Sequence, residues 1–200
     1  MIKTIFMDIG GVLLDISPER TLAELITATD HPESVIREAF HEDALDRYEK
    51  GQIGDDQFYA HFRDALPEPD GLTKDKFFSA WLALLGTCTD SLSVARDLVR
   101  EYPVWLASNT NPFHIRHGTE KGWLDGFSGY IYSFEISARK PHADFFTKAL
   151  TLAGAEARTS LFIDDHRENV ETADKLGFTT IHYRSHEQFC RDLSHHLDRI

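Results

Sequence analysis

The sequence predicts an α/β protein with a doubly wound parallel sheet and a helical cap inserted after the first strand. Two observations indicate this class. In the second half of the chain, short apolar runs alternate with helical patterns, which is typical of a parallel sheet covered by helices on both faces. Residues 17–86, by contrast, contain several amphipathic helical patterns and no convincing strand.

The predicted strands are short apolar runs rich in β-branched and aromatic residues, as expected of strands buried on both faces. They lie at residues 2–8, 103–107, 129–133, 159–164 and 179–183. The helical patterns between them lie at residues 91–101, 142–153 and 167–176. Gly177 is expected to end the last helix, because glycine tolerates the left-handed conformation common after a helix.

The insertion is divided by proline and glycine into separate helical pieces. Its aromatic side chains are expected to form a core of their own; they are Phe58, Phe62, Phe77, Phe78 and Trp81. An insertion at the carboxyl end of a strand lies where open α/β sheets bind ligands, so it can cover a site. We therefore divide the chain into an α/β core domain, residues 1–16 and 87–200, and a helical cap domain, residues 17–86.

The composition excludes several classes of partner. The formal charge of -12 disfavours nucleic acid and anionic membrane surfaces, because both need a cationic protein face. No apolar run approaches the ~18 residues of a membrane span, and a cytoplasmic location is expected. Cys88 and Cys190 lie far apart without a metal or disulfide pattern, and they are expected to be reduced. The sequence leaves the oligomeric state open.

Polar residues follow the predicted strands at the points where the strands end. Asp8 ends the first strand and precedes two glycines, Ser108 and Asn109 follow the second, and Asp164–Asp165 end the fourth. Lys140 lies in the segment after the third strand. Because the carboxyl ends of parallel strands meet at one edge of the sheet, these groups are expected to share a pocket.

These residue types suggest phosphoryl transfer with Asp8 as the nucleophile. A carboxylate that attacks a phosphate dianion meets charge repulsion, so the site needs a cation. Mg2+ prefers oxygen ligands, and Asp8 and Asp165 could supply two of them. Ser108 could hold the phosphoryl group while Lys140 neutralises it.

Four segments, in order along the chain, resemble the four motifs of the haloacid dehalogenase-like superfamily; they are MDIGGVLLD, LASNTN, RKP and LFIDDHREN. More narrowly, these motifs and the segment YEKGQIGDDQFYAHF resemble the branch that contains α-D-glucose-1-phosphate phosphatase. The resemblance covers nearly the whole chain. It implies a Rossmann-like sheet of order 3-2-1-4-5, with the first and fourth strands side by side.

The resemblance also implies roles for individual residues. Asp8 would be the nucleophile and a Mg2+ ligand, with the carbonyl of Gly10 and the carboxylate of Asp165 as further ligands. Ser108 and Asn109 would contact the phosphate, and Lys140 would pair with the nucleophile and the phosphoryl group. Asp164 and Asn169 would orient these groups without contacting the substrate.

One position departs from the pattern. Most phosphatases of the superfamily carry a second aspartate two residues after the nucleophile, and this chain has Gly10 there. A general acid contributes a factor of about 10^2 to 10^4 in rate. Asp15, a cap residue or a bound water could replace it, and the sequence does not choose among them. A good leaving group, such as the anomeric oxygen of a sugar 1-phosphate, would need it least.

Other histidines receive structural interpretations. His114 and His117 share a helical spacing, but no nearby acidic or cysteine partner completes a metal site. Both are expected at the surface or at the rim of the substrate site. His166 follows the acid pair and is expected to be solvated at the start of a helix.

The sequence thus predicts a Mg2+-dependent phosphatase that hydrolyses a small phosphometabolite, preferably a sugar phosphate, through a phospho-aspartate at Asp8. A 2-haloacid dehalogenase is the enzymatic alternative. It would also use an aspartate nucleophile but no metal, so the retained Asp165 argues against it. A catalytically silent binding module is the other alternative, because of Gly10.

Overall fold

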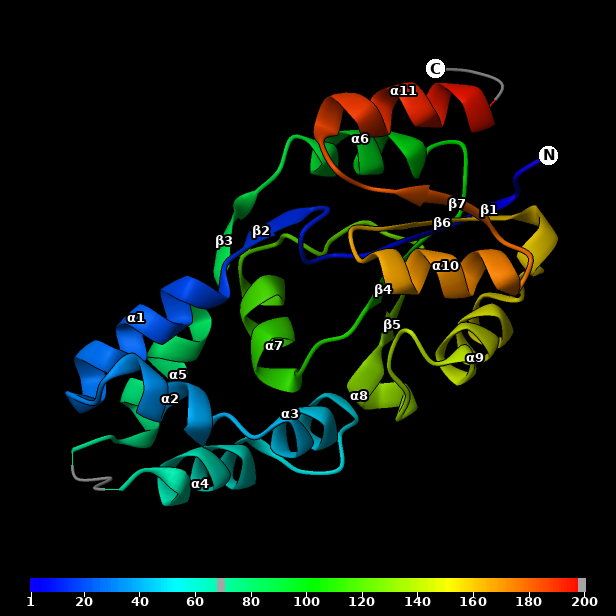
Figure 1. The fold of residues 1–200 in the computed structure, drawn as a ribbon. Helices are drawn as coiled ribbons and strands as arrows, with labels where there is room; N and C mark the ends of the chain where they lie inside the picture. The colour runs from blue at the N-terminus through cyan, green and yellow to red at the C-terminus, as the bar shows by residue number, and fades with distance from the viewer. Residues whose placement is uncertain (68–70, 198–200) are drawn as a thin grey trace.

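The centre of the molecule is a five-stranded parallel sheet (Figure 1). The computed structural model describes residues 1–67 and 71–197. The strand order is β5-β4-β1-β6-β7, which confirms the predicted order 3-2-1-4-5 and the α/β class. The strands are β1 (Thr4–Met7), β4 (Val104–Ser108), β5 (Gly129–Tyr132), β6 (Ser160–Asp164) and β7 (Thr179–His182).

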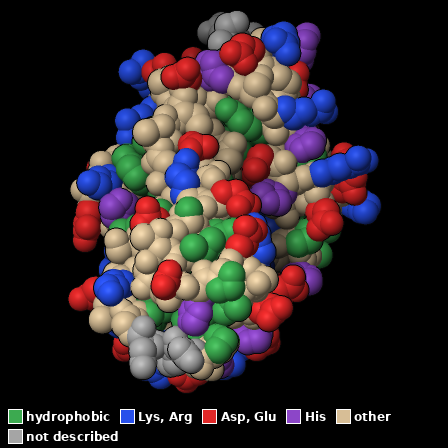
Figure 2. Space-filling view, turned by 60° about the vertical axis from the view of Figure 1, so that its left-hand side comes forward, with side chains coloured by type: hydrophobic (Ala, Val, Ile, Leu, Met, Phe, Trp, Pro, Cys, Tyr) green, Lys and Arg blue, Asp and Glu red, His purple; other side chains and the backbone are tan. Residues whose placement is uncertain are grey.

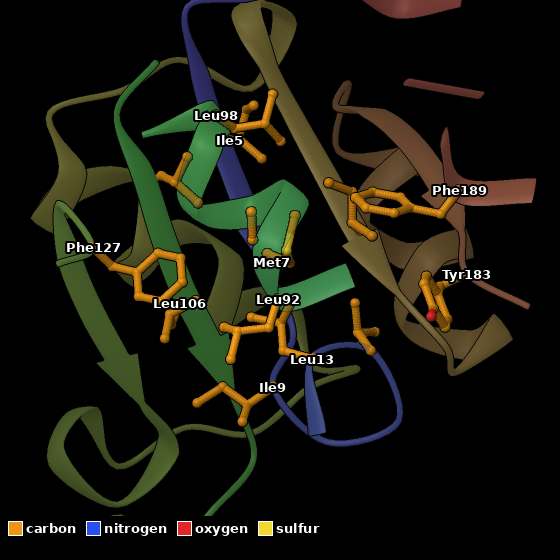
Figure 3. Packing of buried hydrophobic residues seen from close by; sticks show 14 of the residues in the cluster. Ile5, Met7, Ile9, Leu13, Leu92, Leu98, Leu106, Phe127, Tyr183 and Phe189 are labelled. Carbon is orange, nitrogen blue, oxygen red and sulfur yellow. The ribbon is translucent and has the colours of Figure 1, made fainter. Parts of the chain in front are cut away.

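Helices cover both faces of the sheet. Side chains alternate along a strand, so Ile5 and Met7 point to one face and Phe6 to the other. The first face packs against α6 (Ser91–Leu98) and α11 (His186–His196), as Figure 3 shows for Leu92, Leu98 and Phe189. The second face packs against α9 (Ala143–Ala153) and α10 (Arg167–Lys175). Both faces are therefore covered, and the central strands β1, β4 and β6 are largely apolar and almost wholly buried.

Several short elements were not predicted. They are α7 (Pro112–Glu120), α8 (Ser133–Ile136), α11 and the 3-10 turn η1 (Ala157–Thr159). The helix α7 contains Pro112 at its first turn and a glycine inside, and its apolar positions are few. Tertiary contacts therefore decide its conformation more than its own residue preferences.

In its described residues, 17–67 and 71–86, the inserted segment folds into five helices beside the sheet, in the lower left of Figure 1. They are α1 (Pro18–Thr29), α2 (Glu33–Ala39), α3 (Glu42–Glu49), α4 (Asp55–Ala65) and α5 (Lys74–Leu82). The five aromatic residues predicted to form the insertion's own core are buried together in one cluster, which confirms that prediction. The division into a core domain, residues 1–16 and 87–200, and a cap domain, residues 17–86, stays a proposal. Residues 68–70 of the cap and 198–200 of the core lie outside the described residues.

The prediction that residues 17–86 contain no strand is wrong at their end. The strand β3 (Leu85–Cys88) pairs antiparallel with β2 (Leu14–Ile16). Its four residues, LGTC, are half-buried or exposed and show no apolar alternation. Only the pairing with β2, about 70 residues earlier in the sequence, makes this segment a strand, so no local pattern could indicate it.

The surface agrees with the acidic composition. On the face shown in Figure 2, Lys and Arg side chains are scattered among Asp and Glu side chains and form no continuous patch. Within the part of the chain that the structure describes, no helix combines the length and the apolar character that crossing a bilayer requires.

His114 is buried, so the first alternative predicted for it, a position at the surface, is wrong; it lines a cavity between the insertion and the core instead. Its ring stacks on Trp81 of the insertion at a centroid distance of 5.3 Å, and its Nε2 lies 3.1 Å from the carbonyl oxygen of Trp81. The Asn111 amide nitrogen lies 3.1 Å from Nδ1 and can only donate, so the neutral tautomer with the proton on Nε2 satisfies both contacts. His114 thus connects α7 to the insertion.

This buried histidine is expected to make the protein less stable in acid. Burial is the main cause that lowers the pKa of His114 from 6.5 to about 4. Between these values the unfolded chain binds a proton that the folded protein does not, so stability is lost as the pH falls from 6.5 to 4. At about 1.4 kcal/mol per pKa unit the loss is about 3 kcal/mol.

Urea unfolding at a series of pH values measures this loss. The variant His114→Gln should show a pH dependence of the unfolding free energy that is weaker than in the wild type by about 3 kcal/mol over this window. His117→Gln, on the same helix, is the matched control and should keep the wild-type dependence. Equal pH dependence in wild type and His114→Gln would contradict the prediction.

Candidate functional site

The predicted site residues converge around one lysine. Asp8 follows β1, and Asp164 is the last residue of the neighbouring strand β6. The Nζ atom of Lys140 lies 3.0 Å from Oδ1 of Asp8 and 2.6 Å from Oδ2 of Asp164. It also donates a hydrogen bond to the carbonyl oxygen of Ala107 in β4, at 2.8 Å. Parallel pairing brings these strand ends together, as predicted.

These three charged groups are buried, with relative exposures of 6% for Asp8, 3% for Lys140 and 0% for Asp164. Burial is the main cause that raises the pKa of Asp8 to about 7; Lys140 lowers it, and the charges of Asp164 and Asp165 raise it further. Burial opposes the charge of Lys140, but Asp164 and Asp8 outweigh this effect and raise its pKa. Lys140 therefore stays protonated at neutral pH.

Asp164 is fully occupied by hydrogen bonds to the protein. Its Oδ1 accepts from the backbone N–H of His166 at 2.8 Å and from the Asn169 amide at 2.9 Å. Its Oδ2 accepts from Lys140. These bonds orient Asp164 toward the lysine and explain why the chain places an amide at position 169. The geometry suits a supporting role for Asp164 rather than direct ligation.

Asp165 lies beside the glycine turn that follows Asp8. Gly11 has a φ of +74°, and a Cβ atom there would collide with the Asp165 carboxylate. Position 11 therefore requires glycine for two reasons: its backbone has a positive φ, and its Cα lies close to the Asp165 carboxylate. Oδ1 of Asp165 lies 3.0 Å from Nδ1 of His166.

His166 is charged by this neighbour. Its hydrogen bond to Asp165 is the largest effect on its pKa, which is raised to about 9 against the opposing effect of burial. Its side chain is 65% exposed, so the prediction of a largely solvated histidine is correct for its exposure, but His166 also pairs with Asp165. The cluster of three carboxylates and two cationic side chains keeps a net negative charge, which favours a bound cation.

The oxygen atoms near this edge fit a hard divalent cation. Among the described residues, Asp164, Asp165 and His166 offer ligand atoms within 4.8 Å of one another. Because Asp164 is occupied by Lys140 and Asn169, Asp165 is the better donor of the pair. The predicted set of Asp8, the Gly10 carbonyl and Asp165 stays a prediction.

Asn109 holds the lysine segment in place. Its amide nitrogen donates to the carbonyl oxygen of Lys140 at 2.9 Å, and its Oδ1 accepts from the Lys140 backbone N–H at 2.8 Å. The side chain thus positions Lys140, and the second N–H of its amide stays available at the wall of the cavity. Ser108 is buried at the end of β4 and lines the same cavity as Asp8.

A family model described as haloacid dehalogenase-like hydrolase matches residues 2–177, which is most of the chain. This chain belongs to the haloacid dehalogenase-like hydrolases. The four segments on which the resemblance was based all lie within the matched residues.

Two proteins and one solved structure show what this hydrolase is similar to. It is 26% identical to D-ribitol-5-phosphate phosphatase of Bacteroides thetaiotaomicron, over 90% of this chain and 91% of that protein. It is 24% identical to a sesquiterpene phosphatase of Aspergillus oryzae, over 96% of this chain and 94% of that protein. A structure of an enzyme of the same family from B. thetaiotaomicron, in complex with magnesium and inorganic phosphate, has a TM-score of 0.84 and 26% identity, and the match covers 98% of this chain and all of that one.

The hydrolase has a cavity of about 570 Å³ in front of Asp8. From the core it is lined by the predicted residues Asp8, Gly10, Ser108, Asn109, Lys140 and Asn169. Sequence reasoning missed Glu49 and Arg139, which also line this cavity. Glu49 lies in the YEKGQ segment and Arg139 precedes Lys140 in RKP, so the motifs contained both residues without indicating their position in space.

Arg139 joins the lysine segment to the insertion. Its Nη1 lies 2.9 Å from Oδ1 of Asp46, and its Nη2 lies 2.7 Å from Oε2 of Glu49. Both acids belong to α3, which lies beside α8 in Figure 1. The insertion therefore contacts the core next to the catalytic candidates and closes one side of the cavity.

A second cavity of about 420 Å³ lies between the insertion and the core. Much of its lining is apolar and includes Leu22, Phe40 and Trp81. Glu49 and Asn109 line both cavities. The two cavities are therefore adjacent at these residues.

Proposed function

We propose that this hydrolase is a Mg2+-dependent phosphatase that forms a phospho-aspartate at Asp8. The observation that carries the proposal is the buried Asp8 carboxylate, 3.0 Å from the Lys140 ammonium at the wall of a cavity large enough for a small metabolite. Two similar proteins named phosphatases and the similar structure with magnesium and phosphate support it.

In this proposal Asp8, the Gly10 carbonyl and Asp165 would hold Mg2+, which would supply the positive charge that a carboxylate and a phosphate dianion need in order to approach. Lys140 stays protonated and neutralises both the nucleophile and the phosphoryl group. Asp164 and Asn109 orient Lys140, the first through its ammonium group and the second through its backbone. Ser108 contacts the phosphoryl group at the end of β4.

We propose a small phosphorylated metabolite, preferably a sugar or polyol phosphate, as the substrate. The similarity to a D-ribitol-5-phosphate phosphatase supports this class, while the narrower resemblance to α-D-glucose-1-phosphate phosphatase stays a prediction. A panel of sugar 1-phosphates, sugar 6-phosphates, polyol phosphates and isoprenoid monophosphates ranks these possibilities by kcat/KM. Preference for the isoprenoid ester would contradict a sugar or polyol phosphate as the substrate. It would indicate that the apolar lining of the second cavity selects the substrate.

Metal removal is expected to abolish activity. Treatment with EDTA should lower phosphate release from an active ester by more than about 10^2-fold, because the charge of the cation is lost, and Mg2+ should restore it. Asp165→Asn should raise the Mg2+ concentration needed for half activity by about 10-fold or more. Asp174→Asn, an exposed position on α10, is the matched control and should leave this concentration unchanged.

Two further measurements distinguish a phosphatase from a 2-haloacid dehalogenase and from a silent binding module. A 2-haloacid dehalogenase would release chloride from 2-chloropropionate in the presence of EDTA and would not need Asp165. A silent binding module would bind inorganic phosphate without turnover of any ester. Either result would contradict the phosphatase proposal.

A further inference from the structure

The chain lacks the usual acid two residues after the nucleophile, and the structure leaves little room for one. A Cβ atom on Gly10 would lie 3.2 Å from Cδ1 of Ile16, which lines the cavity in its place. Asp15, the nearest acid in sequence, is largely exposed and pairs with Arg20 at 2.8 Å. It does not line the Asp8 cavity. The proton donor must therefore come from elsewhere.

Among the described residues, the carboxylic acids that line the cavity with Asp8 are Glu49 and Glu168. His166 also lines it, but its imidazolium is engaged with Asp165. Glu168 is exposed in the first turn of α10. Glu49 is the last residue of α3, and its side chain is only 14% exposed. It also lines the second cavity, so it lies where the phosphoryl site meets the space available to the leaving group. The oxygen atom between phosphorus and the leaving group would occupy this junction.

The charged groups around Glu49 leave its carboxyl group able to exchange a proton. Burial is the main cause that raises its pKa to about 7; Arg139 and Lys140 lower it, and Asp46 raises it. Arg139 is shared between Glu49 and Asp46, and Asp46 also pairs with Lys50 at 2.7 Å. Nη2 of Arg139 lies 2.7 Å from Oε2 of Glu49, so this ion pair offsets part of the effect of burial on the carboxyl group.

We propose that Glu49 is the general acid and base of the reaction and replaces the carboxyl group missing at position 10. The inference rests on the proposed phosphatase function. In the first step Asp8 Oδ bonds to phosphorus, the bond between phosphorus and the alcohol oxygen breaks, and that oxygen takes the proton of Glu49. In the second step Glu49 takes a proton from water, the water oxygen bonds to phosphorus, and the bond to Asp8 breaks. The sum is ester plus water to alcohol plus phosphate, with both carboxyl groups restored.

The test compares leaving groups in Glu49→Gln, which keeps the side-chain volume but cannot donate a carboxyl proton. For D-ribitol 5-phosphate, whose alcohol leaves poorly, kcat/KM should fall by about 10^2 to 10^3-fold. For p-nitrophenyl phosphate, whose phenolate leaves without a proton, kcat/KM should stay within about threefold, while slow hydrolysis of phospho-Asp8 should produce a burst of p-nitrophenol. The fall of the wild-type kcat/KM for the ribitol ester above about pH 7 should disappear in the variant.

Two further variants separate catalysis from positioning. Glu49→Asp retains a carboxyl group and should recover at least about tenfold of the ribitol ester activity lost in Glu49→Gln. Asp43→Asn changes an exposed acid of the same helix, 82% exposed and without contact to Arg139, and should leave both kcat/KM values within about threefold. An equal loss for both esters in Glu49→Gln, or no loss for either, would overturn the role of Glu49. Asp8→Asn tests the phosphatase proposal separately, because it must remove turnover of both esters whatever Glu49 does.

Discussion

Asp8→Asn is expected to lower phosphate ester hydrolysis by at least about 10^4-fold, because an amide of the same shape cannot act as the nucleophile. The substitution should leave the fold intact. Lys140 keeps its contact with Asp164 at 2.6 Å, so no buried charge loses its last partner. Phosphate release with Mg2+ measures the effect, and circular dichroism confirms folding.

Asp15→Asn is the matched control for this experiment. Asp15 lies in the same N-terminal segment but is exposed and paired with Arg20, and its change should affect the rate by less than about twofold. Acid quenching of the wild type with radiolabelled substrate should place the label on the peptide that contains residue 8. More than about 1% residual activity in Asp8→Asn, or a label on another peptide, would contradict a phospho-aspartate at this position.

Lys140→Met is expected to lower the free energy of unfolding by about 3 to 5 kcal/mol at pH 7.5 in metal-free buffer. The substitution leaves Asp8 and Asp164 buried beside each other without the cation that lies between them, and breaking a buried ion pair from one side costs this much. Acidification from pH 7.5 to 5.5 should restore part of the stability. The folded variant gains by taking up protons on these carboxylates, so its unfolding free energy rises as the pH falls.

Urea unfolding of two further variants tests whether the unpaired buried carboxylates cause this loss of stability. Lys148→Met removes a solvent-accessible ion pair with Asp144 and a hydrogen bond to the carbonyl oxygen of Ile136, and it should change the unfolding free energy by about 1 kcal/mol. Adding Asp164→Asn to Lys140→Met should recover part of the loss, because one of the two unpaired charges is then gone. Equal destabilisation by Lys140→Met and Lys148→Met would show that the buried charges do not determine the effect.

The arrangement around Arg139 connects the insertion to the proposed chemistry. Arg139 precedes Lys140 in the chain and binds Asp46 and Glu49 of α3. The segment that supplies the lysine from the core is therefore also the segment that holds the insertion over the cavity. A substrate whose leaving group contacts Glu49 would meet both parts of the molecule at once.

Much of the core could be predicted from the sequence because its signals are local. The central strands β1, β4 and β6 are almost wholly buried and largely apolar, since both faces of the sheet are covered there, while the edge strands β5 and β7 are only partly buried. Polar residues at the ends of these strands predicted one shared pocket, since parallel strands end at the same edge. The short strand β3 and the burial of His114 could not be predicted, because both depend on partners far away in the sequence.

By itself, then, the sequence determined the α/β class, the strand order through the family resemblance, and the group of Asp8, Ser108, Lys140 and Asp164 at one edge of the sheet. The tertiary structure alone decided that the Asn109 amide hydrogen-bonds to the Lys140 backbone. It also decided that Asp164 rather than Asp165 pairs with Lys140, and that Glu49 lines the cavity. The physical reason is that a local pattern reveals where each strand ends, and the carboxyl ends of parallel strands lie at the same edge of a sheet. Side-chain partners and the position of the insertion over the sheet depend on packing between distant segments, which no local pattern encodes.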